Sequence, residues 1–225
     1  MGNLGPKLLE ELQCENVFTI GGIGVSESVV VTWIIMAVFL LAAILLTRNL
    51  KVENPGRGQL MLEYIVTWLQ GIGEGIIGEE EKGYASYLTS ILIYLGVANL
   101  IGMLGFKPPT KDLNVTAGLA LMSIFLIEYA GIHKKGFRGW LKSFTQPIAI
   151  VTPINILEVF VKPLSLCMRL FGNVLGAFVI MKLIECILPV GLPVIFSAYF
   201  DVFDGLIQAY VFVFLTGLFI KEAIE

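Results

Sequence analysis

Charged residues are scarce in this sequence. Only 15% of the 225 residues are charged, 56% are hydrophobic, and the mean hydropathy is +0.85. Such a composition is too apolar for an ordinary soluble domain. Basic residues are not in excess either, because the formal net charge is −3. A chain without a basic surface has little affinity for a phosphate backbone, so nucleic acid is not expected as a partner.

Motifs for redox, metal or hydrolytic chemistry are missing as well. The three cysteines, Cys14, Cys167 and Cys186, are far apart, and none has CxxC or metal-ligand spacing. We interpret them as small apolar side chains, and they leave the redox compartment undetermined. Neither GxSxG nor HExxH occurs, which argues against an intramembrane hydrolase. No metal or cofactor is expected.

No internal repeat or low-complexity linker divides the chain. Its glycines are plentiful, 24 in all, as is typical where membrane helices approach one another closely. We therefore predict a single membrane domain over 1–225.

Apolar runs predict five membrane spans, each long enough to supply the ~20 helical residues that cross a hydrocarbon core. They occupy 29–47, 84–105, 113–132, 153–188 and 193–221. The last two are separated by the turn sequence "LPVGLP" (188–193) and predict a helical hairpin. Its first helix would be about 54 Å long, against a hydrocarbon core of about 30 Å. That helix must tilt strongly, break or project from the membrane.

Residues 58–78 have a different pattern, with apolar and polar side chains on opposite faces of a helix. The apolar face holds Met61, Ile65, Trp68, Ile72 and Ile76, and the polar face holds Gln59, Glu63, Thr67, Gln70 and Glu74. This favours a helix lying in the membrane interface. Glycines weaken any helix here, so a short helix facing protein is the alternative. The predicted fold class is all-α integral membrane, with five transmembrane helices, one amphipathic interfacial helix and a long tilted C-terminal hairpin.

Lysine and arginine predict the orientation, because they accumulate in cytoplasmic loops. Two clusters mark such loops: Arg48, Lys51 and Arg57, then Lys134, Lys135, Arg138 and Lys142. The N-terminus should be outside and the C-terminus cytoplasmic. Lys107 and Lys111, in a loop predicted to be outside, count against this scheme but are outnumbered.

Charged side chains inside the hairpin are the strongest functional signal. A charge at mid-membrane costs at least ~2.5–3.5 kcal/mol, so each is a functional hypothesis. Arg169 cannot lose its proton to enter lipid, and no carboxylate lies near it in sequence. By helical rise, Glu185 and Asp201 lie near the outer surface, whereas Arg169 and Gln208 lie deeper.

Polar residues form a stripe on each helix of this hairpin. If the first helix continues past Pro163, its stripe holds Glu158, Lys162, Ser165, Arg169, Asn173 and Gly176. The second stripe holds Asp201, Asp204 and Gln208. Two facing polar stripes in lipid favour an ion path over a packing seam. For Lys182 and Glu185, the alternative is that they pair with each other or extend to the interface.

Three segments resemble the subunit a family of rotary F-type ATP synthases. "PLSLCMRLFGN" (163–173) resembles the family's arginine signature on a long tilted helix. "PPTKDLNVT" (108–116) is similar to the family's loop before a membrane helix, and "LIQAYVF" (206–212) to the Gln-Ala-aromatic stretch of its last helix. The order, the spacing and the five predicted spans agree with the family over nearly the whole chain.

The resemblance implies roles for individual residues. Arg169 would face the rotating ring of c subunits, with Asn173 and Gln208 as its polar neighbours. Asp112 and Asn114 match an outer-loop pair, and Glu158 and Lys162 match polar positions on the cytoplasmic side. Many members have an acid nine residues after the arginine, where this chain has Phe178. Glu185, two turns later, would take over. Asp201 stands seven residues before Gln208, where some relatives have histidine or glutamate.

The resemblance also implies a function. The chain would be a subunit without an active site of its own, providing two half-channels that couple H⁺ or Na⁺ movement to rotation of the c-ring. Its partners would be the c-ring, the peripheral-stalk b subunits and the lipid of a bacterial plasma membrane, in a hetero-oligomeric complex. A secondary transporter with an intramembrane arginine as counter-ion is the alternative, although such folds usually have inverted repeats. A structural membrane subunit would leave the buried charges unexplained.

Overall fold

The computed structural model describes most of the chain. The described residues are 16–20, 23–48, 50–51, 55–78, 82–104, 108–145, 149–187, 196 and 198–224. The predicted turn at 188–193 lies outside them, and so do the side chains of Lys182, Glu185 and Asp201. The backbones of these three residues lie in helical segments.

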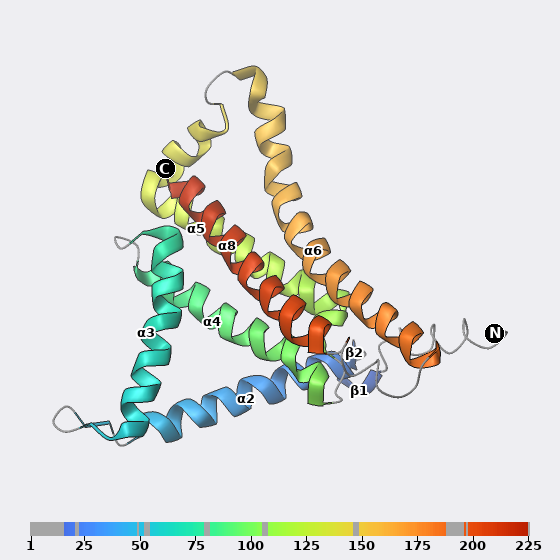
Figure 1. Ribbon diagram of the computed structural model, residues 1–225. Helices are drawn as coiled ribbons and strands as arrows, with labels where there is room; N and C mark the ends of the chain where they lie inside the picture. Colours follow the sequence, from blue (N-terminus) through green and yellow to red (C-terminus); the bar gives the residue numbers. More distant parts are fainter. Residues whose placement is uncertain are drawn as a thin grey trace.

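Helices make up most of the described structure (Figure 1). They are α2 (Glu27–Thr47), α3 (Arg57–Ile77), α4 (Lys82–Leu100), α5 (Leu113–Ser143), α6 (Thr152–Ile187) and α8 (Gly205–Ile224). Short 3₁₀ turns cover Ile101–Leu104, Pro109–Lys111 and Ala149–Val151, and a π-helical segment, Ala198–Asp204, leads into α8. Helix α6 continues through Pro163, which is the condition that its predicted polar stripe depends on.

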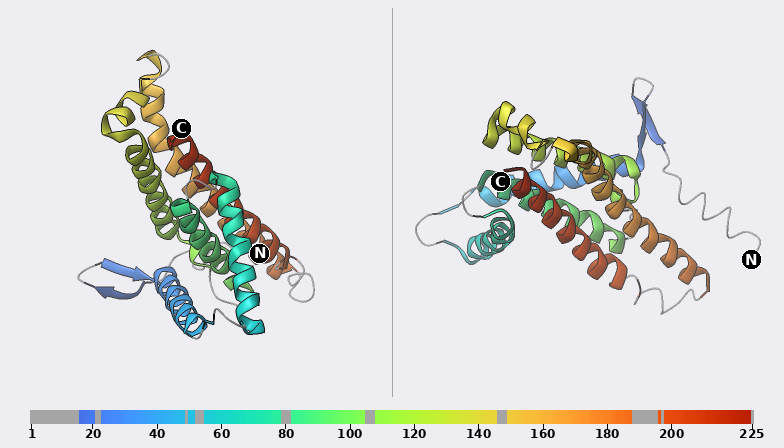
Figure 2. Two further views of the ribbon diagram at one scale, coloured as in Figure 1. Left: turned by 90° about the vertical axis from the view of Figure 1, so that its left-hand side faces the viewer. Right: turned by 90° about the horizontal axis from the view of Figure 1, so that it is seen from above.

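The core lies among α4, α5, α6 and α8. Large side chains of all four helices are fully buried there: Leu88, Leu95, Ile127, Leu166, Leu170, Phe212 and Ile220. Helix α8 packs along both α4 and α5, and α6 packs chiefly on α5. In Figures 1 and 2, α6 runs obliquely across this bundle. The two helices of the predicted hairpin are therefore held in place through α5 and α4.

Four of the described helices are long and apolar enough to cross a membrane: α2, α5, Thr152–Met181 within α6, and Ala198–Ile224, which includes α8. Helix α4, over the second predicted span, is not among them. Its sequence includes Thr89 and Asn99, which are buried against protein. An interior helix can carry such groups because its neighbours satisfy them. An all-helical membrane bundle agrees with the sequence, and the count of five spans stays a prediction.

Two local features differ from the sequence-based expectation. An antiparallel hairpin of β1 (Asn16–Ile20) and β2 (Ile23–Ser26) precedes α2, where the sequence predicts no strand, and it projects from the bundle (Figure 2). Helix α5 continues to Ser143 instead of ending at 132, with a break at Gly136, whose φ is +71°. The stretch 134–142 is polar enough to resemble a loop. Its lysine, arginine and leucine residues nevertheless favour a helix.

Helix α3 crosses the end of the bundle at which α2 ends and α4 begins (Figure 1). Its apolar residues Met61, Ile65 and Trp68 are exposed, whereas Ile76 and Ile77 pack on the core. Exposed apolar side chains at the end of a membrane bundle suit the interfacial position predicted from the sequence.

Contact between α3, α4 and α8 depends on Gly217. A Cβ atom there would lie 2.5 Å from Cγ2 of Ile76 and 2.9 Å from Cδ1 of Leu88. We expect Gly217→Ala to lower stability by about 1–3 kcal/mol through overpacking. Thermal unfolding of the purified protein measures this. Gly75→Ala is the matched control, because its Cβ meets nothing within 4 Å. Equal unfolding temperatures for the two variants would contradict the tight contact.

Candidate functional site

Polar side chains of α6 and α8 meet along the line where the two helices face each other. We call this line the seam and define it by Lys162, Arg169 and Asn173 on α6, and Gln208 and Glu222 on α8. Asn173 Nδ2 donates a hydrogen bond of 2.7 Å to Gln208 Oε1. Two of the residues placed on facing stripes by the sequence are thus in contact. Gln208 is only 4% exposed, and its Nε2 has no partner among the described atoms.

Arg169 lies one turn before Asn173 on α6 and is exposed. Its neighbours on the same helix include the exposed apolar side chains of Leu164 and Met168. No hydrogen bond or ion pair joins Arg169 to the part of the chain that the structure describes. Ser165, one turn earlier, is also exposed. The guanidinium is therefore presented outward on a surface that is otherwise suited to lipid or to another apolar subunit.

The other end of the seam carries an ion-paired cluster. Lys162 Nζ lies 3.1 Å from Glu222 Oε2 on α8 and 3.7 Å from Glu158 Oε2 on α6. A polar cavity of about 220 Å³ adjoins these groups between α5, α6 and α8. Glu128, which also lines it, accepts a hydrogen bond of 2.7 Å from Trp140 Nε1. Sequence reasoning missed Glu222, because an acid near the end of a helix has the pattern of an ordinary solvated residue.

Asp112 is placed away from the seam, at the start of α5. It is 3% exposed, and both carboxylate oxygens are engaged: Oδ1 accepts from the backbone N–H of Asn114 at 2.9 Å, and Oδ2 accepts from Ser26 Oγ at 2.7 Å. The first bond caps α5, a role that aspartate commonly has at the start of a helix. The second ties the start of α2 to the start of α5. The side chain of Asn114 is exposed.

Lys111 is a further residue whose position the sequence did not indicate. It is 5% exposed, and its Nζ lies 3.6 Å from the centroid of the Phe178 ring. A cation over an aromatic face is attracted by the ring quadrupole. Lys111 is therefore not a free loop charge. It counts less against the predicted orientation than an exposed lysine would. Phe178 stands where the resemblance implies an acid in many relatives.

A buried polar network positions the start of α8. Thr110 Oγ1 donates to Asn99 Oδ1 at 2.8 Å, and Asn99 Nδ2 donates to the carbonyl of Gly205 at 2.8 Å. Asp204, just before Gly205, is half-buried one turn ahead of Gln208.

Two acids predicted for the outer path, Glu185 and Asp201, have side chains outside the described residues. Their place relative to Arg169 therefore stays a prediction. Within the described part of the chain, no three His, Cys, Asp or Glu side chains could together hold a metal ion.

Comparison with known proteins identifies the family. Residues 29–221 match the family described as ATP synthase A chain. The chain belongs to this family. It is 37% identical over 209 residues to ATP synthase subunit a 2 of Bradyrhizobium sp. (strain BTAi1 / ATCC BAA-1182), covering 92% of this chain and 93% of the relative. It is 38% identical over 210 residues to ATP synthase subunit a of Moorella thermoacetica (strain ATCC 39073 / JCM 9320), covering 93% and 95%.

A third relative, ATP synthase subunit a 2 of Acaryochloris marina (strain MBIC 11017), is 32% identical over 205 residues, covering 90% of this chain and 87% of the relative. Membership of the ATP synthase A chain family, together with the apolar helices, makes the chain a membrane subunit of a multi-subunit complex. The family assignment agrees with the resemblance drawn from the sequence.

The two bonds of Asp112 predict different effects for two substitutions. Asp112→Ala removes the cap and the acceptor of Ser26, and we expect a loss of about 1 kcal/mol or more in stability. Asp112→Asn keeps an oxygen for the cap, and its amide N–H can donate to Ser26 Oγ, so stability should stay near wild type. Thermal unfolding of both variants tests this. Equal destabilisation by Asn and Ala would show that the negative charge itself is required.

Proposed function

We propose that this chain is the ion-conducting stator subunit of a rotary ATP synthase. In this proposal Arg169 separates two half-channels and faces the ring of c subunits, so that H⁺ or Na⁺ movement is coupled to rotation. The observation that supports this proposal most directly is the exposed guanidinium of Arg169. It has no ion pair or hydrogen bond within the described part of its own chain. A permanent charge on a membrane helix needs a partner, and a second polypeptide supplies one.

The partner in this proposal is a carboxylate on each c subunit. That group crosses lipid in its neutral form and ionises beside Arg169 because the guanidinium stabilises its negative charge. Two opposite charges 4 Å apart attract by about 4 kcal/mol at an effective dielectric constant of 20. The attraction is offset in part by desolvation, which keeps the rotor from being trapped. The same positive charge repels cations and prevents a direct leak between the half-channels.

The seam supplies polar groups on both sides of Arg169. Toward α8, the unpartnered N–H of Gln208 Nε2 is buried, and such a group costs about 1–3 kcal/mol when it stays unpaired. Water or a rotor carboxylate would satisfy it. We assign two sets of side chains to the paths: Asn173, Gln208, Asp204, Glu185 and Asp201 to the outer path, and Ser165, Glu158 and Lys162 to the cytoplasmic path.

Asp112 and Asn114 have a different part in this proposal. Both oxygens of Asp112 are bound within the protein, so Asp112 supports the outer path by fixing α5 and does not bind the ion. Asn114 lies at the outer end of the same helix. The N-terminus is outside and the C-terminus cytoplasmic, with the b subunits of the peripheral stalk as further partners. Its membrane is the bacterial plasma membrane, as the bacterial sources of the relatives suggest.

Substitution of Arg169 tests the proposed coupling. We expect Arg169→Ala to abolish ATP synthesis driven by an ion gradient while the complex still assembles. Arg169→Lys should restore little, because a compact ammonium lacks the planar guanidinium. The measurement is ATP synthesis in inverted vesicles, with Met168→Ala as the matched control at another exposed position of α6. Wild-type synthesis by Arg169→Ala would refute the proposal.

The orientation gives a separate prediction. Arg138 is exposed on the last part of α5. A cysteine placed there by Arg138→Cys should react with a membrane-impermeant maleimide only from the cytoplasmic side. Native Cys14, which lies outside the described residues, should react only from the opposite side. The reverse labelling pattern would overturn the assignment of the outer and cytoplasmic paths while leaving the role of Arg169 open to its own test.

A further inference from the structure

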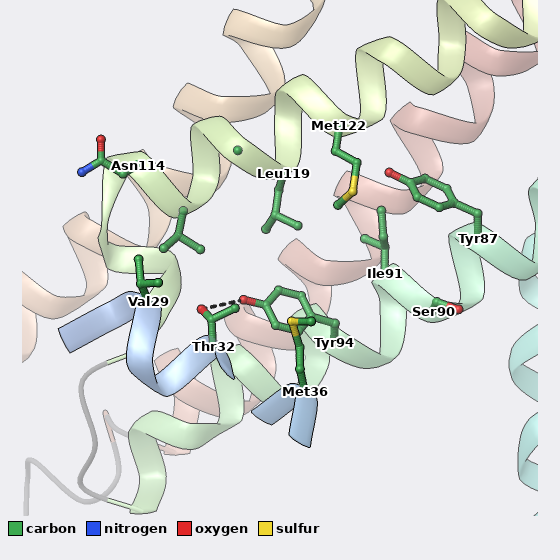
Figure 3. Close-up of a pocket in the computed structure, with 12 residues that line it drawn as sticks. Val29, Thr32, Met36, Tyr87, Ser90, Ile91, Tyr94, Asn114, Leu119 and Met122 are labelled. Carbon is green, nitrogen blue, oxygen red and sulfur yellow. Dashed lines mark hydrogen bonds between the residues drawn. The ribbon is translucent and has the colours of Figure 1, made fainter. Parts of the chain in front are cut away.

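Lys111 is a buried positive charge outside the seam. It ends the 3₁₀ turn Pro109–Lys111, and only 5% of its surface is exposed. The turn packs against α2, α4, α5 and α6. Helix α2 is itself joined to α4 by the contact between Thr32 Oγ1 and the Tyr94 hydroxyl, which Figure 3 shows. Lysine is rarely buried to this extent unless other groups hold its ammonium group.

The ammonium group of Lys111 has a defined position. Its Nζ lies 3.6 Å from the centroid of the Phe178 ring, and Phe178 is half-buried on α6. The attraction between a cation and an aromatic face is larger where water is excluded. The backbone is fixed as well, because the N–H of Lys111 donates to the carbonyl of Pro108 at 3.1 Å. The charge is therefore held in one place and does not move freely in a loop.

Phe178 lies between two residues that we assign to the outer path. On α6 it follows Asn173 by five residues and precedes Glu185 by seven. At the rise of an α-helix these separations correspond to roughly 8 Å and 11 Å. The ammonium group of Lys111 thus lies alongside the stretch of α6 that joins Asn173 to Glu185.

The turn that holds Lys111 is also connected to the second helix of the path. Thr110, the residue before Lys111, donates to Asn99 Oδ1 at 2.8 Å, and Asn99 Nδ2 donates to the carbonyl of Gly205 at 2.8 Å. Asp204, another residue assigned to the outer path, directly precedes Gly205. Two hydrogen bonds therefore link the turn to the segment that carries Asp204.

The carboxylate next to Lys111 in the sequence is directed elsewhere. Both oxygens of Asp112 accept hydrogen bonds, one from Ser26 Oγ and one from the backbone N–H of Asn114. The acids that we assign to the outer path are Glu185, Asp201 and Asp204. Each of them attracts an entering cation, whereas the ammonium group of Lys111 repels it.

We propose that Lys111 sets the affinity of the outer path for the entering cation. Its charge cancels part of the negative potential of the acids, so the ion passes on to the rotor and is not retained. Phe178 holds the ammonium group in this position. The inference rests on the proposed function, because it requires an outer path along α6 and α8. A unit charge about 10 Å from the ion changes its occupancy roughly tenfold at an effective dielectric constant of 20, and salt weakens the effect.

Removing the charge while keeping the length of the side chain tests the proposal. Lys111→Met removes the ammonium group, and Lys111→Arg is the control that keeps a positive charge. ATP synthesis by the complex in vesicles is measured against the outer concentration of the driving ion at constant membrane potential. Na⁺ is varied at constant pH, and pH is varied without Na⁺. We expect Lys111→Met to lower the half-saturating concentration about three- to tenfold, and Lys111→Arg to stay within about twofold of wild type.

Phe178 provides a second comparison, in which Lys111 is unchanged. Phe178→Glu places a carboxylate beside the ammonium group, and Phe178→Gln places a neutral group of the same size there. The Glu variant should have the lower half-saturating concentration of the two, because its charge offsets that of Lys111. This pair decides the question if size-exclusion profiles show that Lys111→Met does not assemble.

An unchanged or higher half-saturating concentration in an assembled Lys111→Met complex would overturn the proposal, and so would equal values for the Glu and Gln variants of Phe178. A reduced maximal rate with an unchanged half-saturating concentration would show that Lys111 acts only on the fold. Failure of the proposed function would be seen elsewhere, as wild-type ATP synthesis by Arg169→Ala. The two failures are therefore distinguishable.

Discussion

A guanidinium keeps its proton at any pH that a cell experiences, and hydrocarbon does not solvate it. Arg169 is under this constraint on α6, near exposed apolar side chains and without a partner in the described part of the chain. The other polar side chains of the seam mostly have partners within the chain. Asn173 is bound to Gln208, and Lys162 is bound to Glu158 and Glu222, so the groups on either side of Arg169 are largely satisfied within the protein. Among the charged side chains described in the seam, Arg169 alone is left to an external partner.

An exposed charge is useful only if the helix beneath it is fixed. Helix α6 packs chiefly on α5, and α8 is fixed by α4 and α5. The network from Thr110 through Asn99 to Gly205 sets the position of α8 just before Gln208. The polar groups of α4 thus act at a distance from the seam. They also make α4 less apolar than its neighbours. Hydropathy alone therefore gives no indication that α8 packs along this helix.

Sequence periodicity predicted the helices and the facing stripes of α6 and α8, because helical spacing alone determines which residues share a face. The Asn173–Gln208 contact agrees with that pattern, although periodicity alone does not determine which helix a stripe faces. Contacts between distant segments could not be predicted in this way. Nothing in the sequence links Ser26 to Asp112, or Lys111 to Phe178, since each pair depends on how the helices pack. The β-hairpin before α2 was missed for a related reason: short strands have too few residues for a clear alternation.

Helix α2 is attached differently from the other helices. It has few buried residues, and its polar links include the Ser26–Asp112 bond at one end and the Thr32–Tyr94 contact nearby. Both links lie in the first part of the helix, so its later part, with Leu45 exposed, offers mainly apolar surface. Between lipid-like surfaces there is little hydrophobic drive for protein helices to associate. Helix α2 is therefore held mainly through contacts near its start, and the apolar side chains of its later part stay exposed.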